Sequence, residues 1–326
     1  MFSQSTRMLN KRGLSSSFTK RPSTRNVELP ESYVISSSEI ETFQPAIGQG
    51  ATSTVFKGRF NGLSVVIKKF NLDEAPRNED YLIREAAELI KLKHDNIINC
   101  YGVCLNQLSL ILELAEKVII IEGKSHRVHS LRQLLETVGS LPFALKNEAL
   151  YQISLGLAYL HSKNIMHGDL KSANVLVTGV NEDDFYFKLG DFGKAHAALS
   201  TRISTNTSLA NNSIRKKTGT ISFEAPEVFL LRQKTEKSDI FAFAMVMYEL
   251  INEELEYPWQ NVFGSCLNSE ALSASILAAV TKGERTPVTG DSPYIKLMKM
   301  CWESDPKRRP EAIQLSEEIV SWQAVD

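Results

Sequence analysis

Two aspartates and an asparagine have the types and spacing that phosphoryl transfer requires. Asp169 lies five residues before Asn174, and Asp191 lies seventeen residues after Asn174. They occur in the stretches His167-Gly168-Asp169-Leu170-Lys171-Ser172-Ala173-Asn174 and Asp191-Phe192-Gly193. One carboxylate could take the proton of a substrate hydroxyl, while a second carboxylate and an amide could supply oxygen ligands to Mg²⁺. A turn before a loop explains most isolated Asp-Phe-Gly tripeptides, so the hypothesis depends on other residues of the chain.

Composition limits the class of protein. The chain has 326 residues, 43% hydrophobic and 23% charged, which is typical of a soluble globular protein with a large core and fits one catalytic unit with two lobes. A net charge of −1 disfavours nucleic-acid binding. The spacing of Cys100, Cys104, Cys266 and Cys301 suggests neither a zinc site nor a disulfide scaffold, so we expect reduced core residues. No apolar run approaches the ~18 to 20 residues of a transmembrane segment, and we expect a cytoplasmic protein.

The N-terminal residues have a different composition. Residues 1–27 carry six Lys or Arg, many Ser and Thr, and no acidic residue before Glu28. This composition predicts a disordered tail, which we place at residues 1–37. The same basic, Ser-rich, acid-poor composition also fits an organelle transit peptide, whereas a secretory signal would need an apolar region that is missing here. Whether the tail is a targeting segment stays open.

A glycine turn and a lysine strand follow the tail. Gly48 and Gly50 precede an apolar strand that contains Val55, and Asn61-Gly62 then makes a good two-residue hairpin connection into Val65-Val66-Ile67-Lys68. Glycines let backbone amides approach a phosphate, although a Gly-x-Gly pattern alone is also explained by a hairpin turn. The turn, the two strands and the lysine together favour a phosphate site.

A glutamate is positioned to orient that lysine. After Pro76, apolar residues in the run from Glu79 to Lys91 have helical spacing, and Glu85 lies within this run. Two more strands are expected at residues 99–103 and 108–112. A buried helix over residues 145–161 then leads the chain to the stretch that contains Asp169.

Taken together, these segments resemble the Gly-rich loop, strand lysine, helix glutamate, catalytic loop and D-F-G motif of eukaryotic-type protein kinases. The resemblance covers about Ile40 to Trp322. It implies an α+β bilobal fold, with a small antiparallel sheet and one main helix over residues 38–113, and a hinge and mainly helical lobe over residues 114–326. The sequence departs from the family at Gly168, where most members carry Arg, at Ser53, which stands at the third glycine position, and at Val66, which replaces Ala.

The resemblance implies roles for individual residues. Asp169 would orient the substrate hydroxyl, Lys171 would balance charge on the transferring phosphoryl, and Lys68 with Glu85 would position the nucleotide. Asn174 and Asp191 would hold Mg²⁺. The ATP-binding residues implied by the family are Ile47, Gly48, Gly50, Ser53, Val55, Val66, Lys68, Leu112, Glu113, Ala115 and Leu176.

Further motifs narrow the activity. The D-L-K-x-x-N form of the catalytic loop resembles Ser/Thr-specific kinases, and the Cys-Trp and Arg-Pro pairs near the end resemble the tyrosine-kinase-like branch. The implied protein is an ATP-dependent Ser/Thr kinase that acts on protein substrates, autophosphorylates, and could have a regulatory protein partner. A pseudokinase scaffold is the alternative, yet such proteins usually lack Lys68, Glu85, Asp169 or Asp191. A small-molecule kinase is disfavoured by the family's closure between Gly219 and Glu227, which shapes a peptide-docking surface.

Other resemblances concern support for the catalytic loop. Asp239 would brace this loop, and Arg309 would pair with Glu227. Because Gly168 carries no charge, it cannot pair with a phosphate on the Ser/Thr-rich segment after Gly193. We therefore expect local packing or a partner to hold that segment; the alternative is a basic residue from elsewhere in the fold.

One segment has no counterpart in most relatives. Val118-Ile119-Ile120-Ile121 is a β-branched run that precedes Glu122-Gly123. We expect an extended connection packed on the lobe, because most loops are short. An extra strand or hairpin at the cleft mouth is the alternative.

Overall fold

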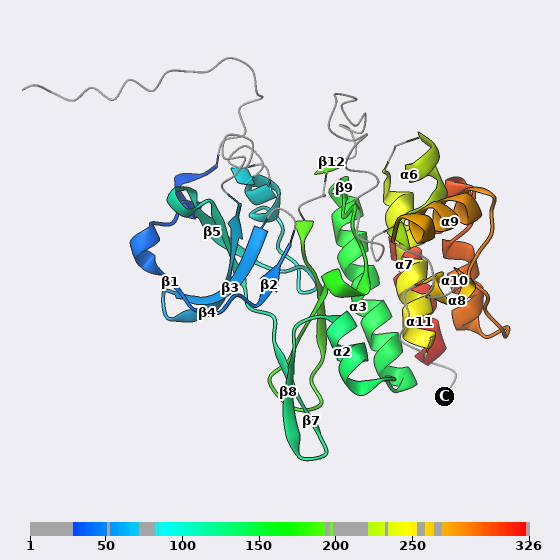
Figure 1. Ribbon diagram of the computed structural model, residues 1–326, viewed down its shortest axis with the longest axis horizontal. Helices are drawn as coiled ribbons and strands as arrows, with labels where there is room; N and C mark the ends of the chain where they lie inside the picture. Colours follow the sequence, from blue (N-terminus) through cyan, green and yellow to red (C-terminus); the bar gives the residue numbers. More distant parts are fainter. Residues whose placement is uncertain are drawn as a thin grey trace, which may run out of the picture.

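The structure is a computed structural model that describes residues 29–50, 53–71, 82–83, 85–192, 196–197, 221–231, 234–252, 258–263 and 269–323. Figure 1 shows a small lobe built around a β-sheet beside a larger, mainly helical lobe. The predicted α+β bilobal fold is confirmed.

The sheet of the small lobe is antiparallel, in the order β1-β3-β4-β6-β5, with β2 paired to β3. Its strands are β1 (Ile40–Thr42), β2 (Gly48–Gln49), β3 (Ser53–Phe60), β4 (Leu63–Phe70), β5 (Cys100–Cys104) and β6 (Ser109–Glu113), with the 3₁₀ turn η4 (Leu105–Gln107) between the last two. Asn61 and Gly62 connect β3 to β4 with positive φ angles of 48° and 79°. This is the backbone of a tight hairpin turn, as predicted.

Alternation along β4 separates the two faces of the sheet. Val65 and Ile67 are fully buried, and they pack with Ile111 in a core cluster. Because successive side chains of a strand point to opposite faces, Val66 and Lys68 face the other way. On that side a helix that includes residues 85–89 buries Ala86 and Leu89 in the main core.

The predicted boundary of the N-terminal tail needs correction. Residues 29–37 are part of the small lobe, with 3₁₀ turns η1 (Glu31–Tyr33) and η2 (Ser37–Glu39). The Ile35 N–H donates to the Val103 carbonyl at 2.8 Å, and the Ile35 side chain is 7% exposed. The boundary at Ser38 was therefore too late, because one apolar side chain and a backbone bridge to β5 add this segment to the sheet's core. Residues 1–28 lie outside the described residues.

The segment after the hinge is a hairpin, so the expectation of an extended connection was wrong. Strands β7 (Lys117–Ile121) and β8 (Lys124–Val128) pair antiparallel, and Figure 1 shows them extending away from both lobes. Glu122 and Gly123 form the turn, with φ angles of 51° and 76°, which match the twist of paired strands. The β-branched run of residues 118–121 supplies strand propensity to β7 before the turn, whereas Val128 is the one β-branched residue of β8.

The inner face of the hairpin attaches it to the large lobe. Ile119 and Val128 are buried in the main core. The Lys117 ammonium contacts the Asn181 carbonyl, donates to the Glu182 carbonyl at 2.8 Å and lies 4.4 Å from the centre of the Phe185 ring. Buried charges require such partners, so Lys117 fixes the base of the hairpin against the loop between β10 (Val175–Thr178) and β11 (Tyr186–Leu189) of the large lobe.

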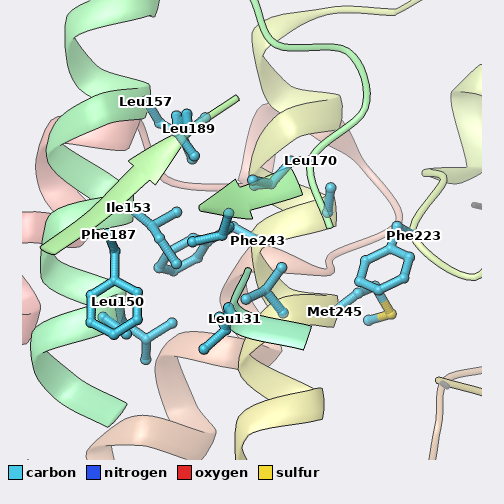
Figure 2. Close-up of a cluster of buried hydrophobic side chains, with 14 of the residues drawn as sticks. Leu131, Leu150, Ile153, Leu157, Leu170, Phe187, Leu189, Phe223, Phe243 and Met245 are labelled. Atoms are coloured by element: carbon cyan, nitrogen blue, oxygen red, sulfur yellow. The ribbon is translucent and has the colours of Figure 1, made fainter. Parts of the chain in front are cut away.

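The large lobe is organised around two buried helices, α3 (Phe143–Ser162) and α7 (Glu236–Ile251). Figure 2 shows Leu150, Ile153 and Leu157 of α3 in the same cluster as Phe243 of α7. The helix predicted over residues 145–161 is confirmed, and it begins two residues earlier. The other elements are α2 (Leu131–Val138), β9 (Ile165–Met166), η5 (Ser172–Asn174), β10 (Val175–Thr178), β11 (Tyr186–Leu189), β12 (His196–Ala197), α6 (Pro226–Leu231), α8 (Gln260–Phe263), α9 (Ser269–Thr281), α10 (Pro293–Cys301), η8 (Pro306–Arg308) and α11 (Ala312–Gln323).

The fold bears on the expectations for the cysteines, for membrane-spanning segments and for the Ser/Thr-rich segment. Cys100, Cys104 and Cys301 are buried free thiols, as expected, while Cys266 lies outside the described residues. Among the described helices, none has the length and apolar character needed to cross a bilayer. Gly193, Gly219, Thr220 and most of the Ser/Thr-rich segment between them lie outside the described residues.

A buried ion pair ties α6 to the chain before α11. Arg309 donates from Nη1 and Nη2 to the two carboxylate oxygens of Glu227 at 2.7 and 2.8 Å. Both residues are buried, with exposed fractions of 2% and 8%. The predicted pairing is confirmed, and its two parallel hydrogen bonds offset part of the cost of removing two charges from water.

We predict that Glu227→Gln lowers the free energy of unfolding by about 3–5 kcal/mol, because the Arg309 charge stays buried without its counter-ion. Urea denaturation of both proteins measures the loss. The control is Asp291→Asn, which breaks the exposed Lys296–Asp291 pair, at 3.3 Å, and should cost at most about 1 kcal/mol. Equal losses in the two variants would contradict the prediction.

Candidate active site

A buried carboxylate of α7 holds the catalytic loop between β9 and η5. The N–H groups of His167 and Gly168 donate to the two oxygens of Asp239 at 2.8 and 2.9 Å, and His161 Nε2 lies 3.1 Å from one of them. Desolvation works to raise the pKa of Asp239, but the hydrogen bond and charge of His161 outweigh it and the pKa is lowered. The carboxylate therefore remains ionised, and the predicted brace of the loop is present.

The loop brings together the three predicted residues of the D-L-K-x-x-N pattern. Lys171 Nζ lies 3.3 Å from Asp169 Oδ2. Asn174 Nδ2 donates to the Asp169 carbonyl at 2.8 Å and lies 3.3 Å from Oδ2. These contacts orient the Asp169 carboxylate, which is the group expected to receive the substrate hydroxyl.

His167 is hydrogen-bonded both within the catalytic loop and to the segment that precedes Asp191. Its Nε2 lies 3.0 Å from the Gly190 carbonyl, and its Nδ1 accepts the Asp169 N–H at 3.3 Å. Since a carbonyl can only accept, Nε2 carries the proton and Nδ1 provides a lone pair. Burial lowers the pKa of His167, which keeps this neutral tautomer. The imidazole thus links the catalytic loop to the residue before Asp191.

A second group of charged residues consists of Lys68, Glu85 and Asp191. Lys68 Nζ of β4 bonds Glu85 at 2.8 Å and Asp191 at 2.9 Å. Desolvation works to lower the pKa of Lys68, but the Asp191 and Glu85 carboxylates outweigh it and raise the pKa above its ordinary value. Lys68 therefore remains a cation, and the predicted pairing with Glu85 is present.

Asp191 has a backbone conformation that separates its side chain from that of its neighbour. Its φ of 57° lies in the left-handed region. The Asp191 carboxylate is half exposed and faces Lys68, whereas Phe192 is buried with its ring 5.1 Å from that of His167. Such a conformation is uncommon outside glycine, and here it directs a charge into the site and an aromatic ring into the core.

The two predicted metal ligands come from adjoining segments. The N–H of Gly190, next to Asp191, donates to the Asn174 carbonyl at 3.0 Å. Because the Asn174 side-chain nitrogen donates to Asp169, its Oδ1 is the side-chain atom that would ligate a cation. A carboxylate and an amide oxygen are the hard ligands that Mg²⁺ prefers, so the donor set fits the predicted metal.

The residues predicted for the nucleotide lie on neighbouring strands. In the sheet register, Val55 is opposite Lys68, and Val66 is opposite Leu112 at the end of β6. Across the site, Leu176 of β10 lies against Gly190, where an added Cβ would come within 2.7 Å of Leu176 Cδ1. The remaining positions are Ile47 before β2, Gly48 in β2, Gly50, whose N–H donates to the Ser53 carbonyl at 2.8 Å, Glu113 in β6 and Ala115 after it.

Two residues that contact the hinge, residues 113–115, were not identified from the sequence. Lys188 of β11 pairs with Glu113 at 2.8 Å, and His129 Nδ1 donates to the Ala115 carbonyl at 2.9 Å. The hinge is thereby bonded to the large lobe on two sides. No local pattern marks either residue, since Lys188 is 75 positions from its partner and His129 follows the inserted hairpin.

The chain belongs to the protein kinase family, because residues 42–320 match the family model described as protein kinase domain. The chain is 30% identical over 269 residues to a probable serine/threonine-protein kinase of Dictyostelium discoideum, covering 81% of this chain and 18% of that protein. It is 30% identical over 280 residues to mitogen-activated protein kinase kinase kinase 7 of Bos taurus (83% and 42%). It is 26% identical over 298 residues to receptor-interacting serine/threonine-protein kinase 1 of Homo sapiens (87% and 40%).

The last two relatives belong to the tyrosine-kinase-like branch, so the resemblance predicted from the sequence is confirmed. The match also agrees with the predicted limits of Ile40 to Trp322 to within two residues at each end. The chain spans less than half the length of each of these three relatives.

A further buried acid connects the catalytic loop to α2. Glu249 of α7 lies 3.2 Å from Arg132 Nη1 of α2, and it accepts hydrogen bonds from Ser172 of η5. Its exposed fraction is 3%, and burial raises its pKa from 4.5 to about 7. Glu249 is therefore a group whose protonation changes near neutral pH inside the folded protein.

We predict that Glu249 makes folding stability fall as the pH rises from 4.5 to about 7. In this window the unfolded chain releases the proton that folded Glu249 retains, so the contribution is complete below 4.5 and lost above 7. The free energy of unfolding of the wild type, relative to Glu249→Gln, should drop across the window by up to about 3 kcal/mol. Urea denaturation at several pH values measures it.

The matched control is Glu136→Gln, because Glu136 also pairs with Arg132, at 2.6 Å, but is 50% exposed. This variant should follow the wild-type pH profile. A Glu249→Gln profile parallel to that of the wild type would show that Glu249 titrates as it does in the unfolded chain.

Proposed function

We propose that this protein transfers the γ-phosphoryl group of ATP, with Mg²⁺, to Ser or Thr hydroxyls of protein substrates. The observation that supports this most directly is that Lys68 bonds Glu85 and Asp191 at 2.8 and 2.9 Å, while Asp239 holds the loop that carries Asp169. A phosphoryl-transfer site requires chiefly positioning and charge, and both groups of residues are assembled.

The catalytic loop supplies the acceptor side. Asp169 takes or orients the proton of the attacking hydroxyl, and its carboxylate is held for this by Asn174. Lys171, 3.3 Å from the same carboxylate, provides positive charge where negative charge develops on the transferring group.

The small lobe supplies the nucleotide side. Lys68, kept charged by two carboxylates, binds the α- and β-phosphates, and Glu85 directs it. The backbone of Glu113 and Ala115 pairs with the adenine edge. The ring is enclosed by Ile47, Val55, Val66 and Leu176.

Asp191 and Asn174 would hold the metal. When bound, Mg²⁺ neutralises charge on the phosphates of the nucleotide. Both ligands are already fixed, Asn174 through Asp169 and Asp191 through Lys68.

The choice of acceptor is supported by Lys171 in the D-L-K-x-x-N pattern and by relatives named as serine/threonine kinases. We further propose autophosphorylation, a cytoplasmic location and a regulatory protein partner. A pseudokinase scaffold is disfavoured, because the four residues that such proteins lose are present and Lys68 is in direct contact with both Glu85 and Asp191.

We predict that Asp191→Ala lowers Mg-ATP turnover toward a Ser/Thr peptide by at least about a hundredfold, because Asn174 alone cannot hold the metal. The control is Asp183→Ala, which removes an exposed carboxylate of the loop between β10 and β11. Thermal melting establishes that both variants fold. Wild-type turnover by folded Asp191→Ala would remove this residue from its proposed role.

A further inference from the structure

The two peptide groups that flank Gly168 are each bonded to a charged side chain. The Gly168 N–H donates to Asp239, and its carbonyl accepts a hydrogen bond from the Lys234 ammonium. Gly168 has a φ of 72°, in the region that glycine adopts without strain. A glycine also has more accessible conformations than any other residue, so the orientation of the following peptide depends on bonds made to it.

Lys234 belongs to the short connection between α6 and α7. Its side chain is 17% exposed, and its Nζ lies 3.9 Å from Glu224 Oε1. Glu224 is 8% exposed and lies in the segment before α6 that the family resemblance assigns to peptide docking. A cavity of about 20 Å³ is lined by Gly168, Asp169, Glu224 and Lys234 together with residues of α7. Lys234 thus lies between the catalytic loop and the docking segment.

The charges on the two sides of Gly168 match the direction of its peptide dipoles. A carboxylate faces the N–H and an ammonium faces the carbonyl, so both hydrogen bonds are charge-assisted and stronger than neutral ones. Most relatives carry an arginine at position 168, on the loop itself. Here the cation beside the loop comes from residue 234, 66 positions away.

We infer that Lys234 is a positioning residue: it fixes the Gly168–Asp169 peptide so that Asp169 faces the acceptor, and through Glu224 it links this orientation to the docking segment. The cation is part of the protein, so the loop is held without a phosphate on the segment after Gly193. This inference rests on the proposed function, whose failure would be visible as an inactive wild-type enzyme.

The test compares Lys234→Met with the wild type by steady-state kinetics. Because Asp169 orients either acceptor, kcat should fall at least about tenfold for both peptide phosphorylation and slow hydrolysis of ATP by water. The KM for ATP should stay within about twofold, since Lys68 and the hinge are unaffected. Lys234→Arg, which can donate to the same carbonyl, should recover most of the lost kcat.

The control is Lys237→Met. Lys237 is similarly exposed, at 20%, and donates to the Arg309 carbonyl at 2.8 Å, away from the loop. It should lower the melting temperature and leave kcat unchanged. If Lys234→Met behaves in the same way, Lys234 is only structural and the inference is overturned.

Two other results would also overturn it. A rise in peptide KM with unchanged ATP hydrolysis would mean that Lys234 shapes the docking segment alone. If Lys234→Met does not fold, Lys234→Gln takes its place, because the glutamine side chain is shorter and its donor is neutral. Wild-type kcat in Lys234→Gln would refute the proposed role. A Lys234→Arg variant that recovers none of the lost kcat would also refute it.

Discussion

The buried Asp239 carboxylate is the interaction on which the site depends. Its helix, α7, is enclosed by the main core, so the carboxylate cannot move to find other partners. An ionised acid in such a place is costly unless its oxygens are bonded, and His161 with the N–H groups of His167 and Gly168 supplies those bonds. These bonds hold the catalytic loop against α7 at the two residues that precede Asp169.

A second set of charges orders the nucleotide side. Lys68 comes from the sheet, Glu85 from the helix beside it and Asp191 from the segment that follows β11, so one ammonium connects three parts of the chain. The two charge systems meet where His167 contacts the Gly190 carbonyl and Gly190 bonds Asn174. These two contacts connect the segment that carries Asp191 to the loop that carries Asp169 and Asn174.

The sequence predicted those parts of the site that contiguous motifs specify. Asp169, Lys171 and Asn174 lie within six residues, and hydrophobic spacing located the helix that carries Glu85. The family resemblance added the long-range pairs of Asp239 and Arg309. Lys234 and Glu249 could not be found in this way, because their partners are distant in sequence and only the packing of α7 brings them to the loop. The hairpin after the hinge was the alternative to the expected extended connection, because a β-branched run is compatible with both.

Charges built into the fold, from Asp239 and Lys234, hold the catalytic loop where relatives with arginine at position 168 would use a phosphate. A phosphate that pairs only with solvent-exposed basic side chains would contribute ~0 to 1 kcal/mol, which shifts a two-state equilibrium by less than about tenfold. The direct measurement is the initial rate toward a Ser/Thr peptide before and after phosphatase treatment, with phosphate removal followed by mass spectrometry. We expect most of the activity to remain after phosphate removal; a loss of about a hundredfold or more would show that a phosphate holds the loop.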